Sequence, residues 1–163
     1  MTAEDRTIQR DRMRFIKNSL SSSLALLGIL LDVFYFVSIY KSDVGTYYYN
    51  YIIGISIVYN LIFMLAVFLS SEGVKNYKKS YSYLLAVIGV VQIVRIFIIP
   101  MTAHSTTTIV NGVEMVVMQD GQFLRVVAYL VLSAACLIAS AVVNFIRCGE
   151  LEAHLKSLGI QGA

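Results

Sequence analysis

The sequence predicts an all-α integral membrane protein whose four transmembrane helices form one bundle. The first observation is composition: 58% of the 163 residues are hydrophobic and 14% are charged, whereas soluble domains average about 45–50% apolar and about 25% charged residues. The second is that the apolar residues fall into four blocks, each near the roughly 20 residues that a helix needs to cross the hydrocarbon of a bilayer. The blocks are residues 19–40, 51–69, 82–100 and 124–145.

The first block resembles the apolar part of a signal peptide because basic residues precede it. It is longer than the usual roughly 7–15 apolar residues, and no small-x-small cleavage site follows it. We therefore expect the first helix to remain in the mature protein. Neither a linker nor a low-complexity tract separates the four blocks, so residues 1–163 are expected to form a single domain.

The distribution of Lys and Arg predicts the orientation, because cytoplasmic loops carry an excess of both. The loop after the first helix has only Lys41, and residues 101–123 have neither Lys nor Arg. We therefore expect both termini in the cytoplasm, with a basic segment at 1–18, a tail at 147–163, and an extracellular loop at 101–123. The expected location is the plasma membrane. Ten of the 13 basic residues fall on the predicted cytoplasmic side: Arg6, Arg10, Arg12, Arg14, Lys17, Lys75, Lys78, Lys79, Arg147 and Lys156.

The two loops expected outside the cell differ in length and composition. The first is short and rich in tyrosine, with "GTYYYNY" at residues 45–51, which is typical of the aromatic belt at the lipid headgroups. The second contains Asn111 and Gly112 between two β-prone runs, a pair that suits a type I′ hairpin turn. We expect a small extracellular β-hairpin of residues 106–110 with 113–117. Since a lone hairpin is only marginally stable, it should lean on the helix ends, the tyrosine-rich loop or another protein.

The cytoplasmic tail contains a short helical pattern. Leu151, Leu155 and Leu158 recur at helical spacing, and Gly159 follows at the position of a C-cap. The pattern predicts a short amphipathic helix, either separate from the fourth spanning helix or continuous with it. It is expected to lie on the membrane, on the protein's own cytoplasmic loop or on a partner.

Three charged residues lie inside or at the edge of the apolar blocks: Asp32, Arg95 and Arg125. Because the helices alternate in direction, all three are expected at similar depths in the outer half of the membrane. An isolated charge costs roughly 2.5–3.5 kcal/mol at the centre of a spanning helix. Pairing of Asp32 with Arg95, and also with Arg125, would offset much of that cost.

Helical spacing places further polar side chains on the faces that carry these charges. Small and polar side chains mark helix contacts in membranes, because the lipid side gains nothing from them. Two interpretations of the cluster stay open. Either it fixes the register of the helices, or it lines a cavity open to the outside, where the arginines favour an anionic or carboxylate-bearing ligand over a metal cation. The expected cluster comprises Asp32, Tyr35, Asn60, Gln92, Arg95, Arg125 and Tyr129.

Motifs of catalytic or cofactor sites are absent from the sequence: it has no HExxH, no GxSxG and no phosphate-binding glycine loop. His104 and His154 are expected on opposite sides of the membrane, and Cys136 and Cys148 match no metal or redox spacing. We therefore expect no enzymatic activity, no cofactor and no metal. The net charge of +3 reflects membrane topology rather than a nucleic-acid surface.

Two functional hypotheses follow. The first is a non-enzymatic subunit or accessory component that assembles with itself or with a larger membrane complex through its helices and outer loop. The alternative is a small oligomeric transporter or channel with an outer-half site for an anionic or small polar ligand. A lipid-modifying membrane enzyme is a third hypothesis that no motif supports. The expected partners are the lipid bilayer and either further copies of the chain or another membrane protein, without nucleic acid.

Overall fold

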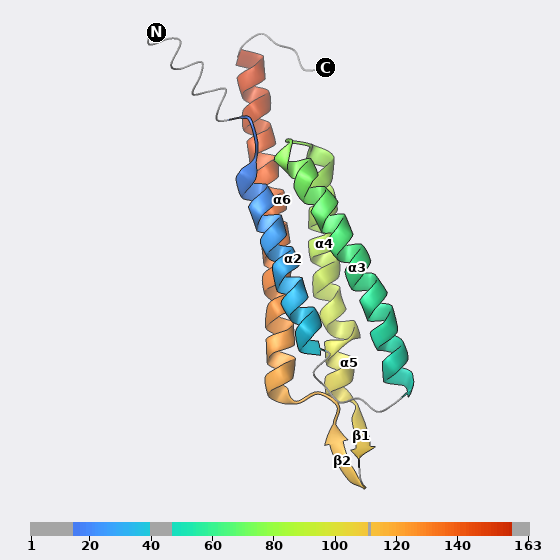
Figure 1. Ribbon diagram of the computed structural model, residues 1–163. Coiled ribbons are helices and arrows are strands. Elements are labelled where there is room, and N and C mark those ends of the chain that lie inside the picture. Colours follow the sequence, from blue (N-terminus) through green and yellow to red (C-terminus); the bar gives the residue numbers. More distant parts are fainter. Residues whose placement is uncertain (1–14, 40–46, 111, 158–163) are drawn as a thin grey trace.

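The computed structural model describes residues 15–39, 47–110 and 112–157. Its long helices are α2 (Ser19–Ile39), α3 (Tyr47–Lys75), α4 (Lys79–Ile98) and α6 (Asp120–Ser157) (Figure 1). The short helix α5 (Pro100–Ser105) and the strands β1 (Thr107–Val110) and β2 (Val113–Val116) connect α4 to α6. In this part of the chain, four helical segments are long and apolar enough to cross a membrane. The structure therefore fits a small multi-pass membrane protein.

The outer surface of the bundle is apolar along the length of the helices. Leu30, Leu61 and Val142 are 49%, 60% and 50% exposed although each lies well inside a long helix. An apolar surface of this extent marks contact with lipid or with another protein. The buried faces instead include serine, glycine and asparagine, which are the residue types that let helices approach and hydrogen-bond in membranes.

α6 forms the centre of the bundle. It packs along both α2 and α4, whereas α3 packs mainly on α2 and only lightly on α4. Figure 1 shows α3 diverging from the other helices toward its Tyr47 end. α2 lies close to α6 because Gly28 has no side chain: a Cβ at that position would lie 2.9 Å from Leu137 Cδ2. Among the long helices that pack side by side, α3 and α4 contact each other least.

The buried apolar side chains form two clusters at different heights in the bundle. At the hairpin end, which carries α5, β1 and β2, Tyr35 and Leu130 pack with residues that follow α4. At the tail end, where α3 turns into α4 and α6 extends beyond the other helices (Figure 1), Ala25, Leu85 and Leu137 pack together with side chains of α3. The layer between these two clusters contains the buried charges.

The second spanning helix is longer than predicted at both ends. α3 covers Tyr47–Lys75 rather than 51–69, so most of the predicted tyrosine-rich loop is helical, while residues 45 and 46 lie outside the described part. At the other end, Ser70 Oγ donates to the backbone oxygen of Ala66 at 2.6 Å. Ser71 Oγ lies 2.8 Å from the Oγ of Ser22 on α2. Because these hydroxyls are satisfied, the serines do not end the helix.

The third predicted helix, 82–100, is divided at its hairpin end. α4 begins earlier, at Lys79, and ends at Ile98, and Pro100 begins α5 instead of closing the third helix. Proline is tolerated at the first helical position because its missing N–H has no intrahelical partner there. The N–H of Ala103 donates to the Ile99 oxygen at 2.9 Å, so the first residues of the predicted 101–123 loop are helical.

β1 and β2 pair as an antiparallel hairpin, in a register that runs from Thr107 opposite Val116 to Val110 opposite Val113. Gly112 in the turn has a φ of 80°, the left-handed geometry that a tight two-residue turn requires. Its predicted neighbour in the turn, Asn111, lies outside the described residues. In Figure 1 the hairpin projects from the end of the bundle, beyond α5.

α6 is one continuous helix of 38 residues. It joins the predicted fourth spanning helix, 124–145, to the predicted tail helix, and it begins within the predicted outer loop, at Asp120. Leu151 and Leu155 are half-buried on its tail-end turns. Leu158 and Gly159, which complete the predicted amphipathic pattern, lie outside the described residues, as do residues 1–14 of the predicted basic segment.

Candidate functional site

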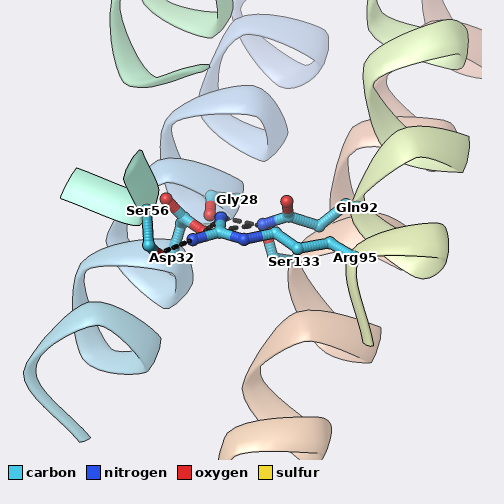
Figure 2. A network of polar contacts seen from close by, with 6 residues as sticks. All are labelled: Gly28, Asp32, Ser56, Gln92, Arg95 and Ser133. Carbon is cyan, nitrogen blue, oxygen red and sulfur yellow. Dashed lines mark hydrogen bonds and ion pairs between the residues drawn. The ribbon is translucent and has the colours of Figure 1, made fainter. Parts of the chain in front are cut away.

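Asp32 of α2 and Arg95 of α4 form the predicted ion pair, with Arg95 Nη1 3.3 Å from Asp32 Oδ1 (Figure 2). Gln92, one turn before Arg95, donates its Nε2 to the same carboxylate oxygen at 2.7 Å. Asp32 and Gln92 are fully buried, and Arg95 is 3% exposed. Each charge would be costly alone in the interior of the bundle, so the pairing is what allows both to lie there.

The guanidinium group of Arg95 also contacts α3. Its Nη2 donates to Ser56 Oγ at 3.3 Å. Its Cζ lies 4.4 Å from the ring centroid of Tyr35 and 4.8 Å from that of Tyr59, distances at which an aromatic ring attracts a cation. The expected cluster therefore includes Tyr35, while Ser56 and Tyr59 are additional members. The sequence signal for Ser56 was its position one helical turn from Asn60, whereas Tyr59 lies about 100° away from Asn60 around the helix and had no such signal.

Ser133 connects the cluster to α6. Its hydroxyl donates to the backbone oxygen of Gly28 at 2.9 Å and lies 3.5 Å from Gln92 Nε2. Ser133 can reach this carbonyl oxygen because glycine has no side chain that would block it. Gly28 lies on the face of α2 that also carries Asp32, one turn later. All four spanning helices thus contribute to one polar layer, as Figure 2 shows for the labelled side chains.

Several buried polar atoms of this layer have no hydrogen-bond partner among the described residues. They are Asp32 Oδ2, the hydroxyl oxygen of Tyr35, Gln92 Oε1 and Arg95 Nε, together with both amide atoms of Asn60, which lies one helical turn from Ser56 on α3. In Figure 2 the Gln92 amide oxygen points away from the contact with Asp32. An unpaired buried polar group costs about 1–3 kcal/mol, and such groups in folded proteins call for a water, an ion or a ligand as partner. The cluster is thus only partly satisfied by the protein itself.

A second polar network, at the tail end, is satisfied by the protein. Asn18 Nδ2 donates to Asn144 Oδ1 at 2.9 Å, and Asn144 Nδ2 donates to Ser82 Oγ at 2.6 Å and to the Lys78 oxygen at 3.3 Å. The N–H of Asn18 donates to the Lys75 oxygen at 3.0 Å. Among the described side chains, those of this network leave no buried nitrogen or oxygen unpaired. Its role is to hold α2, α6 and the α3–α4 turn together.

Arg125 lies outside the cluster, contrary to the expected pairing with Asp32. It is exposed on α6, and its Nε donates to the backbone oxygen of Gly121 at 3.0 Å. Tyr129 is half-buried, with its ring 5.9 Å from that of Phe34. The prediction failed because each step of four residues advances about 40° beyond a full helical turn. After two such steps, Arg125 no longer shares the buried face on which Ser133 lies.

A lateral groove of about 200 Å³ reaches the cluster between α3 and α4. Its walls are apolar, and Ser56, Tyr59 and Arg95 are the residues with polar groups that line it. Val91, Val94 and Ile98, which line it on α4, are 40%, 50% and 61% exposed. The groove therefore opens sideways, on the apolar surface of the bundle.

Other residues with reactive or metal-binding chemistry are scattered. Within residues 15–39, 47–110 and 112–157, no group of three or more His, Cys, Asp and Glu side chains is placed to hold a metal ion. His104 lies near the hairpin, with Nε2 3.8 Å from Asp120 Oδ1. His154 stacks on Phe15 at the other end of the bundle, with 5.2 Å between ring centroids.

In comparisons with known proteins, no family model, no curated protein and no solved structure matches the chain.

Proposed function

We propose that this chain is a small non-enzymatic membrane protein that binds a polar ligand at the Asp32–Arg95 cluster. The observation that carries the proposal is the contrast between two buried asparagines. Asn144, at the tail end, uses its amide fully, whereas Asn60, one helical turn from Ser56 on α3, has no partner among the described residues for either amide atom. Unpaired buried polar atoms add no stability to a network whose role is only structural.

The ligand that suits the cluster is small and polar or acidic. Arg95 keeps an unpaired Nε donor, and Asp32 and Gln92 each keep an unpaired oxygen. A carboxyl or similar group that both donates and accepts hydrogen bonds complements this set. Ligand binding of this kind favours the transporter or channel hypothesis. Because four helices leave little room for a private path, transfer across the membrane would take place within an oligomer.

The proposed orientation places the tail end in the cytoplasm and the hairpin outside the plasma membrane. In its support, Lys75, Lys78, Lys79 and Arg147 lie at or near the tail end, whereas Arg125 is the basic residue at the hairpin end within the described residues. Cytoplasmic loops carry such an excess of basic residues.

The experiment that tests ligand binding is a thermal-shift screen of the purified chain against small acids, amides and amino acids. A bound ligand raises Tm because it stabilises only the folded state. The expected result is a compound that shifts the Tm of the wild type but not that of the uncharged double variant Asp32→Asn/Arg95→Gln. A compound that shifts both proteins equally would place its site elsewhere and contradict the proposal.

A second candidate function is that of a subunit within a larger membrane assembly. It is favoured by a hollow of about 580 Å³ on the flank of α3, lined by Tyr51, Gly54, Ile55, Val58, Tyr59 and Ile62. A small residue between larger apolar ones lets a neighbouring helix approach closely. Purification from the native host in mild detergent, followed by mass spectrometry, tests it. A stoichiometric partner protein or a defined homo-oligomer supports assembly, and a monomer contradicts it.

A further inference from the structure

The lateral groove between α3 and α4 leads from the lipid-facing surface to Arg95. Ile55 on α3 and Val91, Val94 and Ile98 on α4 form its walls, and Arg95 lines it together with Ser56. The two apolar clusters of the core lie above and below the polar layer. A molecule that reaches Arg95 through this groove therefore comes from the bilayer and has an apolar part that matches the walls.

Arg95 keeps one buried donor without a partner behind the wall of the groove. Its Nη1 contacts Asp32 at 3.3 Å, and its Nη2 contacts Ser56 at 3.3 Å, both long for a charge-assisted hydrogen bond. Its Nε has no partner among the described residues although it is buried. Nε is therefore the donor that a ligand group can take, and Ser56, the partner of Nη2, is a second residue of the groove.

The charge balance restricts the headgroup further. Asp32 and Arg95 together carry no net charge, so a ligand with a full negative charge would leave one uncompensated charge in the interior of the bundle. A carboxylic acid that keeps its proton carries one acceptor next to one donor. Its acceptor suits the unpaired Nε of Arg95 and its donor suits the unpaired Oδ2 of Asp32, and these two side chains contact each other through Nη1 and Oδ1.

We infer that the groove binds a long-chain carboxylic acid from the bilayer, with its alkyl chain between α3 and α4 and its carboxyl group at Arg95. The inference rests on the proposed function, since it names the ligand class of the same cluster. No bond is formed or broken, and the acid enters with its own proton.

The test is equilibrium binding of radiolabelled palmitic acid to the full chain in nanodiscs of phosphatidylcholine. Val94→Phe fills the groove and leaves the ion pair unchanged, so it should weaken binding at least tenfold. Val142→Phe is the matched control, because Val142 and Val94 are both 50% exposed and Val142 lies on α6, away from the groove. It should bind within twofold of the wild type. Equal affinity in wild type and Val94→Phe would overturn the inference.

Competitors define the headgroup. Methyl palmitate keeps the chain and the carbonyl but has no O–H donor, so it should compete at least tenfold less well than palmitic acid. Equal competition by the ester, or stoichiometric displacement of palmitic acid by phosphatidylglycerol in the nanodisc, would overturn the assignment to a carboxylic acid.

Two further outcomes separate the assignment of a long-chain acid from the proposed polar site itself. If butyric acid stabilises the wild type through the cluster but palmitic acid does not bind, the long-chain assignment is wrong and the polar site stands. If Asp32→Asn/Arg95→Gln binds palmitic acid as the wild type does, both are overturned.

Discussion

Ser21 and Ser140 hydrogen-bond reciprocally across the contact between α2 and α6. The Oγ of Ser21 donates to the backbone oxygen of Ser140 at 2.7 Å, and the Oγ of Ser140 donates to the backbone oxygen of Ser21 at 2.6 Å. Both residues are fully buried. Small side chains bring the two backbones close enough for each hydroxyl to reach the opposite chain, so this pair fixes both the distance and the register of the two helices.

Replacement of either serine tests this role. Ser21→Ala and Ser140→Ala should each lower the free energy of unfolding by about 0.6 kcal/mol, with an upper bound of about 1.7 kcal/mol, the range of interhelical hydrogen bonds in membranes. The two hydroxyls are 2.9 Å apart, so the double variant should not equal the sum of the single variants. Unfolding in SDS–detergent mixtures measures these values. Ser80→Ala, at an exposed position, should show no effect, and a loss of stability there equal to that of Ser140→Ala would contradict the assignment.

Asn144 and Asn60, both fully buried, should respond differently to the same change. Asn144→Leu removes three hydrogen bonds and leaves Nδ2 of Asn18 unpaired in the interior, so the free energy of unfolding should fall by about 1–3 kcal/mol. Asn60→Leu removes an amide that no described residue pairs, and the stability should stay within about 0.5 kcal/mol of the wild type or rise. Tm values of the ligand-free proteins in detergent compare the two. Equal losses at both positions would show that Asn60 is structural.

The ion pair should be sensitive to the loss of one partner and tolerant of the loss of both. Asp32→Asn or Arg95→Gln leaves one uncompensated buried charge, so each should lower the free energy of unfolding by about 3–5 kcal/mol. The double variant carries no charge in the layer and should recover most of that loss. Arg125→Gln is the control, because Arg125 is exposed on the surface of α6. If Arg125→Gln destabilises the protein as much as Arg95→Gln does, Arg125 belongs to the buried cluster with Asp32 and Arg95, and its exposed position on α6 is wrong.

The proposed orientation is testable with single cysteines. In a background in which Cys136 and Cys148 are replaced by Ala and Ser, Glu114→Cys places a thiol on β2 and Lys156→Cys places one near the end of α6, both at exposed positions. A membrane-impermeant maleimide should label Glu114→Cys on intact cells, and it should label Lys156→Cys only after permeabilisation. The reverse pattern would mean that the excess of basic residues at the tail end does not set the topology.

The sequence by itself determined the membrane class and the number of spanning helices, because the length and composition of an apolar block are local properties. It also placed Asp32 and Arg95 on facing stripes. Helix ends were less predictable. α3 continues past Leu69 because Ser71 finds a partner on α2, and Pro100 begins α5 rather than ending a helix. The first outcome depends on a hydrogen bond between two helices, which the local pattern does not contain.

Only the tertiary structure decided which polar residues meet. It excluded Arg125 because four-residue steps drift around a helix, and it added Ser56 and Tyr59 from α3. It also separated a satisfied network around Asn144 from an incompletely paired one around Asp32 and Arg95, although both are built from buried polar side chains. The physical reason is that hydrogen-bond satisfaction depends on distances of a few ångströms between helices, which the spacing within one helix does not specify.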